Sequence, residues 1–250
     1  MADQYIEAMF PERLLDALAA PLRHLPSQCA VCRSWARQRL CEACVERYAA
    51  PRPRCRLCAI GVPTGVAVCG ACQKQPPPFD HAIAAVDYDH PWDELVRRFK
   101  FDAALDLAGA LAQRLLYTVR RSDAPRPDWL LPVPLAAGRL RERGYNQAWE
   151  LTRRVAPRLP CAFDARLLLR LKDTPQQLAL PPDKRAANVR GVFAVDPRRL
   201  PELQGRSVAL LDDVMTTGAT TAEVARTLLQ AGARSVQVWV LARTPRPQDA

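Results

Sequence analysis

Short apolar runs alternate with helical patterns over most of the chain. Asp128–Pro134 contains an apolar run that ends in Pro-Val-Pro, and Val208–Leu211 is continuously apolar. Both are short enough for strands buried in a parallel sheet. His81–Tyr88 and Ser235–Ala242 also read as strands, and apolar residues recur at helical spacing from about Ala103 to Arg120. Strands that alternate with helices predict an α/β fold, with a parallel sheet flanked by helices.

The N-terminal part follows a different pattern. Pro11–Leu25 is amphipathic and carries mixed charges, which favours a packed helix over one that lies on a membrane. Its apolar side consists of Leu14, Leu15, Leu18, Leu22 and Leu25. Gln75–Pro78 is proline-rich and stiff, so a domain boundary is expected there. The predicted organisation is a helix over 1–27, a small module over 28–75 and a larger domain over 79–250.

The most informative stretch runs from Ser207 to Ala233. A buried strand leads into two adjacent carboxylates, Asp212 and Asp213, then into a small hydroxyl-rich loop, and then into a helix with Gly232 near its end. The hydroxyl groups belong to Thr216, Thr217, Thr220 and Thr221. The predicted order is therefore strand, acidic pair, loop and helix.

This order favours a phosphorylated sugar as the ligand. Unpaired N–H groups and the dipole at a helix N-terminus attract an anion, and Gly218 lets the backbone approach a phosphate closely. Carboxylates repel a phosphate, so Asp212 and Asp213 should face vicinal ribose hydroxyls or a Mg²⁺ shared with the ligand. The alternative is an ordinary turn in which Asp213 or one threonine merely caps the helix.

The same stretch resembles the signature that binds 5-phosphoribosyl-1-pyrophosphate (PRPP) in the type I phosphoribosyltransferases. The match consists of apolar residues, two acids, an apolar residue and Thr-Thr-Gly-Ala-Thr in unbroken register. It implies that Asp212 and Asp213 bind the ribose hydroxyls. The 5′-phosphate would be held by Thr216, Thr217, Gly218, Ala219 and Thr220. The dinucleotide motif G-x-G-x-x-G and the P-loop motif are both absent from the chain.

A second element of the site is expected after the strand at Asp128–Pro134. The segment that follows the carboxyl end of a parallel strand lies on the ligand-binding edge of the sheet. In the type I phosphoribosyltransferases the pyrophosphate loop occupies this place, which implies that residues 134–144 hold pyrophosphate with Mg²⁺. The expected contacts are Leu135, Arg139, Arg143 and Gly144, with Arg141 as a further source of charge. Taken alone, the segment would read as a basic surface loop. Catalysis is expected to depend on Asp212, Asp213 and Arg143. A helix is expected to begin at Pro91 and to run through Phe101, and Lys100 within it reads as a solvated helix lysine.

A third element is the long polar segment between strand-like runs at Ala165–Leu169 and Gly191–Val195. Such a long loop inside a compact domain is usually functional, and a lid over a water-sensitive sugar is the expected role. The lid would run over 172–185. Its expected contacts are Lys172, Thr174, Gln177 and Arg185.

Eight of the nine cysteines form four C-x-x-C pairs. The pairs are Cys29/Cys32, Cys41/Cys44, Cys55/Cys58 and Cys69/Cys72. Two thiolates at this spacing can reach one tetrahedral metal ion, so two structural zinc ions are expected. A disulfide framework suits secreted chains, and redox C-x-x-C motifs usually occur singly. Sequential pairing, which would give two zinc ribbons in tandem, is favoured, while an interleaved cross-brace stays open. Cys161 stands alone and is expected to be buried.

The charge of the chain is compatible with an anionic partner. The formal net charge is +10, and two tetrathiolate zinc sites would reduce it to about +6. Arginines and aromatics between the cysteines suit phosphate and base contacts, although a small metal module could simply have a charged surface. They are Arg33, Arg37, Arg39, Arg47, Arg52, Arg54 and Arg56, with Trp35 and Tyr48. The sequence shows neither a membrane-length apolar run nor a signal-peptide pattern, so a cytoplasmic protein is expected.

Together these segments are similar to the ComF family of competence proteins. The similarity includes the cysteine-rich region, P-V-P…R-G-Y-N-Q at 132–147, R-x-K-x-T-x-x-Q-x-x-L…R-x-x-N-V at 170–189 and L-D-D-V-M-T-T-G-A-T at 211–220. It implies a zinc-binding N-terminal part, a type I phosphoribosyltransferase domain and a link to DNA uptake in natural transformation.

Three functions stay open after this resemblance. The first is a PRPP-binding phosphoribosyltransferase whose acceptor is unknown. The second is a non-catalytic accessory protein that binds PRPP only as a ligand, with single-stranded DNA or a competence helicase as its partner. The third is a nucleobase salvage enzyme, which the cysteine module disfavours. Membrane insertion is not expected.

Overall fold

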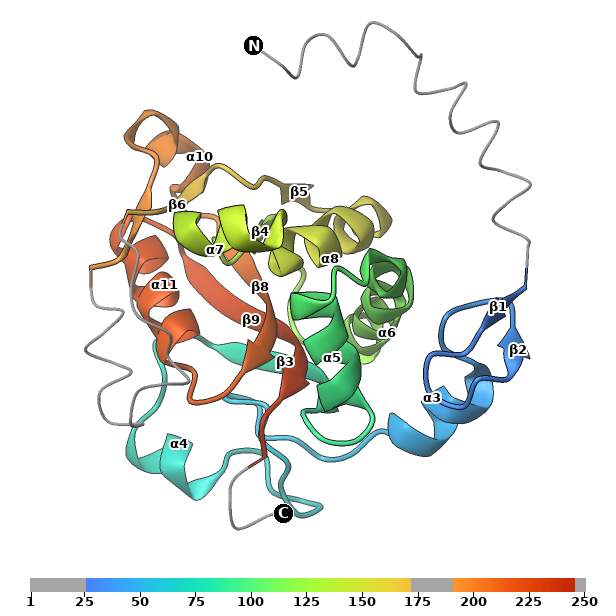
Figure 1. The fold of residues 1–250 in the computed structure, drawn as a ribbon. Coiled ribbons are helices and arrows are strands. Elements are labelled where there is room, and N and C mark those ends of the chain that lie inside the picture. The colour runs from blue at the N-terminus through green and yellow to red at the C-terminus, as the bar shows by residue number, and fades with distance from the viewer. Residues whose placement is uncertain (1–25, 172–190, 246–250) are drawn as a thin grey trace, which may run out of the picture. The chain divides into compact units, whose positions relative to one another are not determined.

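The computed structural model of the chain describes residues 26–171 and 191–245 (Figure 1). The chain divides into two compact units, one that ends at Tyr48 and one that begins at Ala49. This division falls inside the module expected over 28–75, so the two halves of that module belong to different units. The helix expected over Pro11–Leu25 lies outside the described residues.

The first unit is small. It contains the two-stranded antiparallel sheet of β1 (Ser27–Gln28) and β2 (Trp35–Ala36), followed by helix α3 (Glu42–Tyr48). Its buried side chains include Cys29 and Cys44. The cysteines thus take the place that a hydrophobic core has in a larger domain.

The second unit is built on a five-stranded sheet in the order β3-β9-β8-β4-β5, with every neighbouring pair parallel. The strands are β3 (His81–Asp87), β4 (Trp129–Pro132), β5 (Ala162–Phe163), β8 (Ser207–Met215) and β9 (Ser235–Arg243). The central strands β8 and β9 are almost continuously buried, as the apolar runs predicted. The expectation of an α/β fold with a parallel sheet flanked by helices is confirmed.

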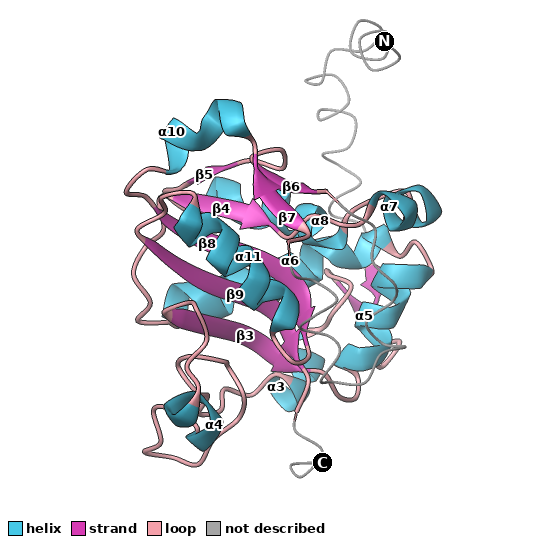
Figure 2. Ribbon diagram, turned by 90° about the vertical axis from the view of Figure 1, so that its left-hand side faces the viewer, coloured by secondary structure: helices cyan, strands magenta, loops and turns pink. Residues whose placement is uncertain are grey.

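Helices cover both faces of this sheet. α6 (Ala108–Arg121) and α8 (Gln147–Val155) pack on one face, and α11 (Ala219–Gln230) packs on the other, as Figure 2 shows. Between α11 and the sheet lies a cluster of buried residues that includes Val208, Leu210, Val224, Leu228 and Val238. Each fully buried side chain of this size contributes about 1.5–3 kcal/mol to folding. The two layers therefore hold the carboxyl ends of the strands in fixed positions.

Short elements complete the unit. They are α4 (Gly70–Lys74), α5 (Trp92–Phe101), η1 (Leu105–Leu107), α7 (Ala137–Arg143), η2 (Ala156–Arg158), the antiparallel pair β6 (Leu168–Arg170) and β7 (Phe193–Val195), η4 (Pro197–Arg199) and α10 (Leu200–Leu203). In the described residues, no helix is long and apolar enough to cross a membrane.

Two elements differ from the expectation. Strand β8 continues through the acidic pair to Met215 instead of ending before it, because its ladder with β9 extends as far as Met215 and Arg243. The segment 137–143, expected to be a loop, forms α7. It has no buried residue, and it ends at Gly144, whose left-handed φ of 78° caps the helix. Local helix propensity and this cap account for α7, since core packing does not.

Candidate functional site

The candidate site lies where the order of the strands in the sheet reverses, between β4 and β8. β4 and β8 are neighbours, but the chain continues from β4 outward to β5 and from β8 in the opposite direction to β9. The segments after β4 and β8 therefore diverge at the carboxyl edge of the sheet, which is where parallel α/β sheets form their binding crevice. The Val133 N–H donates to the Leu211 carbonyl at 2.9 Å, so the segment after β4 emerges beside Asp212.

The acidic pair follows the apolar run of β8, and the strand stays largely buried as far as Met215. Side chains alternate along a strand, so the two carboxylates start on opposite faces of the sheet, with Asp212 on the side of α11. Asp213 is 7% exposed, and its backbone N–H donates to Asp212 Oδ1 at 2.9 Å. The two carboxylates are therefore close together but in different surroundings.

Lys100 forms an ion pair with this acidic pair. Its Nζ lies 3.1 Å from Asp213 Oδ1, and its side chain is only 20% exposed. The interpretation of Lys100 as a solvated helix lysine is wrong. Trp92, Leu95, Val96 and Phe99 bury one face of α5 against the rest of the unit, and this packing directs the last turn toward the end of β8. The helical pattern alone did not show which strand that turn would face.

The surroundings of Asp212 make its ionisation costly. Burial raises its pKa, the charge of Asp213 raises it further, and the charge of Lys100 acts in the opposite direction, so the pKa lies at about 8. A group that donates hydrogen bonds to Asp212, or a cation beside it, would favour the charged form. Vicinal hydroxyls and Mg²⁺ are both suited to this role.

The loop after β8 leads into the N-terminus of α11 through a left-handed glycine. Gly218 adopts the left-handed conformation with φ of 81° and precedes the first residue of α11. The first N–H groups of a helix have no acceptor within the helix, and the dipole adds positive potential there. Thr217 is exposed, and its Oγ1 accepts from the Ala219 N–H at 3.3 Å. Thr221, in contrast, is buried and donates to the Gly218 carbonyl at 3.0 Å, so its hydroxyl serves the helix.

Arg143 lies against Phe101, the last residue of α5. Its guanidinium lies over the Phe101 ring, 4.7 Å from the ring centroid, and its Nη1 donates to Gln147 Oε1 at 3.3 Å. Its Nε is buried and has no hydrogen-bond partner within 26–171 and 191–245. A half-buried arginine whose Nε has such an unused donor is suited to an anion. Phe101 follows Lys100 in the chain, so two cationic side chains approach the same helix end.

The other residues predicted for pyrophosphate belong to the same segment. Leu135 lies between β4 and α7, Arg139 lies within α7, and Gly144 ends it. Leu135 and Arg139 are half-buried. The structure thus places a short helix where the prediction had a loop, and it presents Arg143 from the C-terminal end of that helix.

Residues 145–147 fix this segment to its surroundings, a role that the sequence analysis did not assign. The Tyr145 hydroxyl donates to the Phe99 carbonyl, and Asn146 Nδ2 donates to the Val133 carbonyl at 3.1 Å. Asn146 Oδ1 also accepts from the Ala148 N–H at 3.0 Å and so caps α8. The Tyr-Asn dipeptide therefore connects α5, the end of β4 and α8.

The predicted lid lies outside the described residues, with Lys172, Thr174, Gln177 and Arg185. Its two flanks are described. β6 and β7 pair as antiparallel strands, close to the strand-like runs predicted on either side of the segment. The Gly191 N–H donates to Glu223 Oε1 at 2.7 Å, which ties the second flank to α11, the helix that follows the turn at Gly218.

The eight paired cysteines form two tetrads in sequential order. In the first tetrad, Cys29, Cys32, Cys41 and Cys44, all Sγ atoms lie within 4.8 Å of one another, and the same holds for Cys55, Cys58, Cys69 and Cys72. The Cys32–Cys41 and Cys58–Cys69 sulfur distances are both 3.7 Å. A tetrahedral Zn²⁺ with Zn–S bonds of about 2.3 Å requires sulfurs about 3.8 Å apart, whereas a disulfide requires about 2 Å. The sulfur positions fit zinc, and the open alternative of interleaved pairing is excluded.

The two tetrads repeat one backbone turn. The Cys29 N–H donates to the Ser34 carbonyl at 2.8 Å, and the Cys55 N–H donates to the Ile60 carbonyl at 2.8 Å. Both turns contain a non-glycine residue with positive φ, Arg33 at 65° and Ala59 at 56°. In each tetrad the second C-x-x-C pair lies at the start of a short helix, α3 or α4. Cys161 belongs to neither tetrad. It is half-buried rather than buried, and burial raises its pKa.

The basic residues near the tetrads differ in their contacts. Arg52 and Arg54 pair with Asp87, each at 2.7 Å, and Arg39 Nη1 donates to the Gln28 carbonyl at 2.7 Å. In the first unit, Arg33 and Arg37 are exposed on either side of Trp35, which is 71% exposed on β2. Only part of the predicted basic set is therefore suited to an external anion.

Comparison with known proteins identifies relatives over most of the chain. No family model matches. The chain is 36% identical to the DNA utilization protein YhgH of Salmonella typhi over 230 residues, which cover 88% of this chain and 98% of that protein. It is 34% identical to competence protein F of Haemophilus influenzae over 225 residues, 86% of this chain and 96% of the relative. It is 29% identical to competence protein ComFC of Bacillus subtilis over 158 residues, 63% of this chain and 62% of the relative.

Solved structures are more distant. A glutamine PRPP amidotransferase from B. subtilis matches with a TM-score of 0.36 and 16% identity, over 58% of this chain and 30% of that one. A hypoxanthine-guanine phosphoribosyl transferase of L. donovani matches with a TM-score of 0.33 and 14% identity, over 59% and 75%. Structural similarity at this level does not identify residues of the site.

Proposed function

Since the chain belongs to the ComF family of competence and DNA-utilization proteins, we propose that it binds PRPP with Mg²⁺ at the carboxyl ends of β4 and β8. One observation supports this most directly. The acidic pair and the turn before α11 lie at the carboxyl end of β8, and the segment that contains Arg143 follows the neighbouring strand β4. The strand order reverses between these two strands. We also propose that the protein acts in DNA uptake and is located in the cytoplasm.

The chemical roles follow from charge. The amides and hydroxyls of Thr216, Thr217, Gly218, Ala219 and Thr220 would hold the 5′-phosphate at the positive end of α11. Asp212 and Asp213 would accept hydrogen bonds from the ribose hydroxyls, which would release Lys100 from Asp213. Lys100 and Arg143 would then face the departing pyrophosphate, with Leu135, Arg139 and Gly144 beside it.

If the protein is a transferase, it would act mainly by positioning and by charge stabilisation. The bond from C1′ to the pyrophosphate oxygen breaks, the pyrophosphate leaves with the electron pair, and an acceptor forms the new bond at C1′. Mg²⁺ would neutralise charge on the pyrophosphate. Arg143, Asp212 and Asp213 are the proposed catalytic residues. The lid residues Lys172, Thr174, Gln177 and Arg185 would exclude water.

The first experiment is a calorimetric titration of PRPP with Mg²⁺ into the wild type and into the Asp212→Asn/Asp213→Asn variant. The matched control is Asp123→Asn, an exposed aspartate in the segment that leads into β4. Binding to the wild type and to the control, lost in the double variant, is the expected result. If neither the wild type nor the control binds, the proposed PRPP site is wrong. A screen of acceptors, free nucleobases included, then separates a salvage enzyme from other transferases.

A second candidate function is an accessory role on single-stranded DNA. Trp35 projects from the first unit between two exposed arginines, and exposed aromatics among cationic side chains are typical of single-strand binding. PRPP would then be a ligand that is bound but not consumed. This function predicts DNA binding that weakens steeply with salt and no turnover of PRPP. A competence helicase is a further proposed partner.

A further inference from the structure

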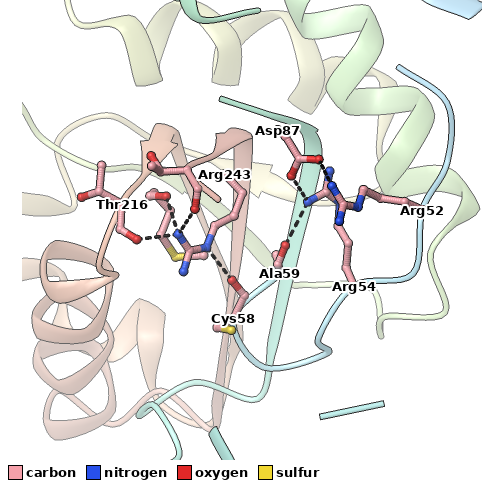
Figure 3. Close-up of polar contacts among 9 residues, drawn as sticks. Arg52, Arg54, Cys58, Ala59, Asp87, Thr216 and Arg243 are labelled. Carbon is pink, nitrogen blue, oxygen red and sulfur yellow. Dashed lines mark hydrogen bonds and ion pairs between the residues drawn. The ribbon is translucent and has the colours of Figure 1, made fainter. Parts of the chain in front are cut away.

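Arg243 connects three segments at the carboxyl edge of the sheet. It is the last residue of β9 and is only 7% exposed. Its Nε donates to the Cys58 carbonyl at 2.8 Å, and its Nη1 donates to the Met215 carbonyl at 3.0 Å and to the Thr216 carbonyl (Figure 3). One guanidinium thus contacts both the second cysteine tetrad and the first residue of the predicted phosphate loop.

The Cys58 end of this connection is a turn fixed by the tetrad. The Cys58 sulfur is one of the four that fit a metal ion, so a bound ion would hold the main chain on which its carbonyl sits. The next residue, Ala59, is fully buried in the same hydrophobic cluster as Met215. The turn and the end of β8 therefore share a core as well as a hydrogen-bond partner.

The second tetrad is also attached to the sheet at a separate place. The Ala82 N–H in β3 donates to the Arg56 carbonyl at 2.8 Å. Arg54 and Arg52 both pair with Asp87 at the end of β3, as Figure 3 shows. These contacts fix the tetrad to the edge strand but do not touch the phosphate loop. Arg54 Nη1 also donates to the Ala59 carbonyl at 3.1 Å, so this attachment reaches the same turn as Arg243, but from the side of β3. A variant at Asp87 therefore tests attachment of the turn to β3, and a variant at Arg243 tests its connection to the phosphate loop.

We infer that Arg243 is a positioning residue for the phosphate loop and that metal in the second tetrad controls the loop through it. The inference rests on the proposed PRPP site. With metal bound, the Cys58 carbonyl holds Nε of Arg243, and the same planar group holds the Thr216 carbonyl. Without metal, the turn at Cys58 is released and the guanidinium loses one of its anchors. The loop amides then lose the orientation that a phosphate needs, because an anion site depends on donors fixed before binding.

Matched cysteine variants of the full chain test the role of the metal. Cys58→Ser and Cys32→Ser remove the equivalent ligand from the second and first tetrads, and each is followed by zinc content and by titration with PRPP and Mg²⁺. Cys58→Ser is expected to lower PRPP affinity at least tenfold, whereas Cys32→Ser stays within twofold of the wild type. Equal effects of the two variants, or no effect of Cys58→Ser once its zinc is lost, would overturn the inference.

Arginine variants test the route. Arg243→Lys keeps the charge but replaces a planar group with a single ammonium, which is not suited to hold Cys58 and Thr216 together. Asp87→Asn weakens the separate attachment to β3. Arg243→Lys is expected to lower PRPP affinity at least tenfold while zinc content is kept, and Asp87→Asn is expected to change affinity less than twofold. Loss of affinity in both variants to the same extent would assign the effect to docking alone.

Hydrogen exchange separates failure of this inference from failure of the proposed function. The backbone amides of 214–222 are expected to exchange faster in Cys58→Ser and in Arg243→Lys than in the wild type, whether or not PRPP is present. Faster exchange in a protein that does not bind PRPP would refute the proposed function and leave the coupling intact. PRPP binding by the wild type with unchanged exchange in both variants would refute the coupling.

Discussion

Lys100 Nζ lies 3.1 Å from Asp213 Oδ1, so the acidic pair at the end of β8 has a cation supplied by α5. The ion pair joins a helix on one side of the sheet to the strand that carries the predicted ribose site. It explains how two adjacent carboxylates are tolerated in a poorly solvated place. It also makes Lys100 a group that a ligand with hydroxyls must displace.

Replacement of Lys100 tests this relationship. Lys100→Met is expected to lower the free energy of unfolding by about 1–3 kcal/mol at pH 8, because a buried charge loses its partner. The loss should be smaller at pH 5, where Asp212 is protonated and the two carboxylates repel each other less. Chemical denaturation at both pH values measures it. Arg97→Met, which removes two exposed ion pairs, with Glu94 and Asp102, is the control and should have a smaller effect.

PRPP binding should depend on the ionisation of Asp212. The pKa of Asp212 is raised to about 8, and the charged form is the one that accepts hydroxyl hydrogen bonds. Binding should therefore release a proton below pH 8, and the affinity should rise as the pH increases from 6 to 8. Calorimetry in two buffers with different ionisation enthalpies counts the proton. An affinity that falls over this interval would contradict the assignment of Asp212 to the ribose.

The raised pKa of Asp212 predicts that removing its charge stabilises the protein at high pH. A carboxyl whose folded-state pKa is raised above the unfolded value of about 3.9 destabilises the fold increasingly as the pH rises from about 4 to about 8. Asp212→Asn stays neutral and should raise the melting temperature at pH 8 but not at pH 4. Thermal scans at the two pH values measure it, with Asp123→Asn as a control that should change neither.

Gly218 should be required for the turn before α11. A Cβ at this position would come no closer than 3.6 Å to another atom, Met215 Sδ, which is ordinary contact, but the φ of 81° is unfavourable for any other residue. Gly218→Ala is expected to cost about 1–2 kcal/mol and to weaken PRPP binding. Gly109→Ala in α6 has open space and should be neutral or stabilising by about 0.5 kcal/mol. Equal effects would show that the turn is not constrained.

The tetrads should hold close to two zinc ions per chain, one each. Cys29→Ser and Cys55→Ser should each reduce the content to about one, and Cys161→Ser should leave it unchanged. Elemental analysis of purified protein measures the content. A value near zero with oxidised cysteines would contradict the metal sites, and a value near one in the wild type would restrict them to one tetrad.

Trp35 should contribute to binding of single-stranded DNA. Trp35→Ala should cost about 1–3 kcal/mol if one base stacks on the ring. Arg33→Ala and Arg37→Ala should each reduce the salt slope of the affinity by about 0.7. Fluorescence anisotropy with a labelled oligonucleotide over a series of salt concentrations measures both, with Arg126→Ala as a basic control. An affinity that does not respond to salt would contradict a DNA contact here.

The sequence predicted features that depend on neighbouring residues better than contacts between residues far apart in the chain. The strands around the acidic pair and the sequential order of the tetrads could be predicted, because apolar runs and C-x-x-C spacing act over a few residues. Lys100 and Arg243 could not be assigned, because the partner of Lys100 lies more than 100 residues away, and those of Arg243 lie 27, 28 and 185 residues away along the chain. Helical spacing showed only that Lys100 follows a buried phenylalanine. α7 was missed because its basic composition resembles a loop and none of its residues is buried.

The same backbone turn occurs in both tetrads, but its residue with positive φ has different surroundings in each. The residue with positive φ is an exposed arginine in the first tetrad and a fully buried alanine in the second. Such a pair is what duplication of a small metal-binding unit, followed by divergence, would produce. The second tetrad belongs to the larger unit, where any change at Ala59 must fit the core. Arg33 of the first tetrad is exposed, so its side chain can differ among relatives within the limits that its positive φ sets, and differences in partner should be concentrated around it.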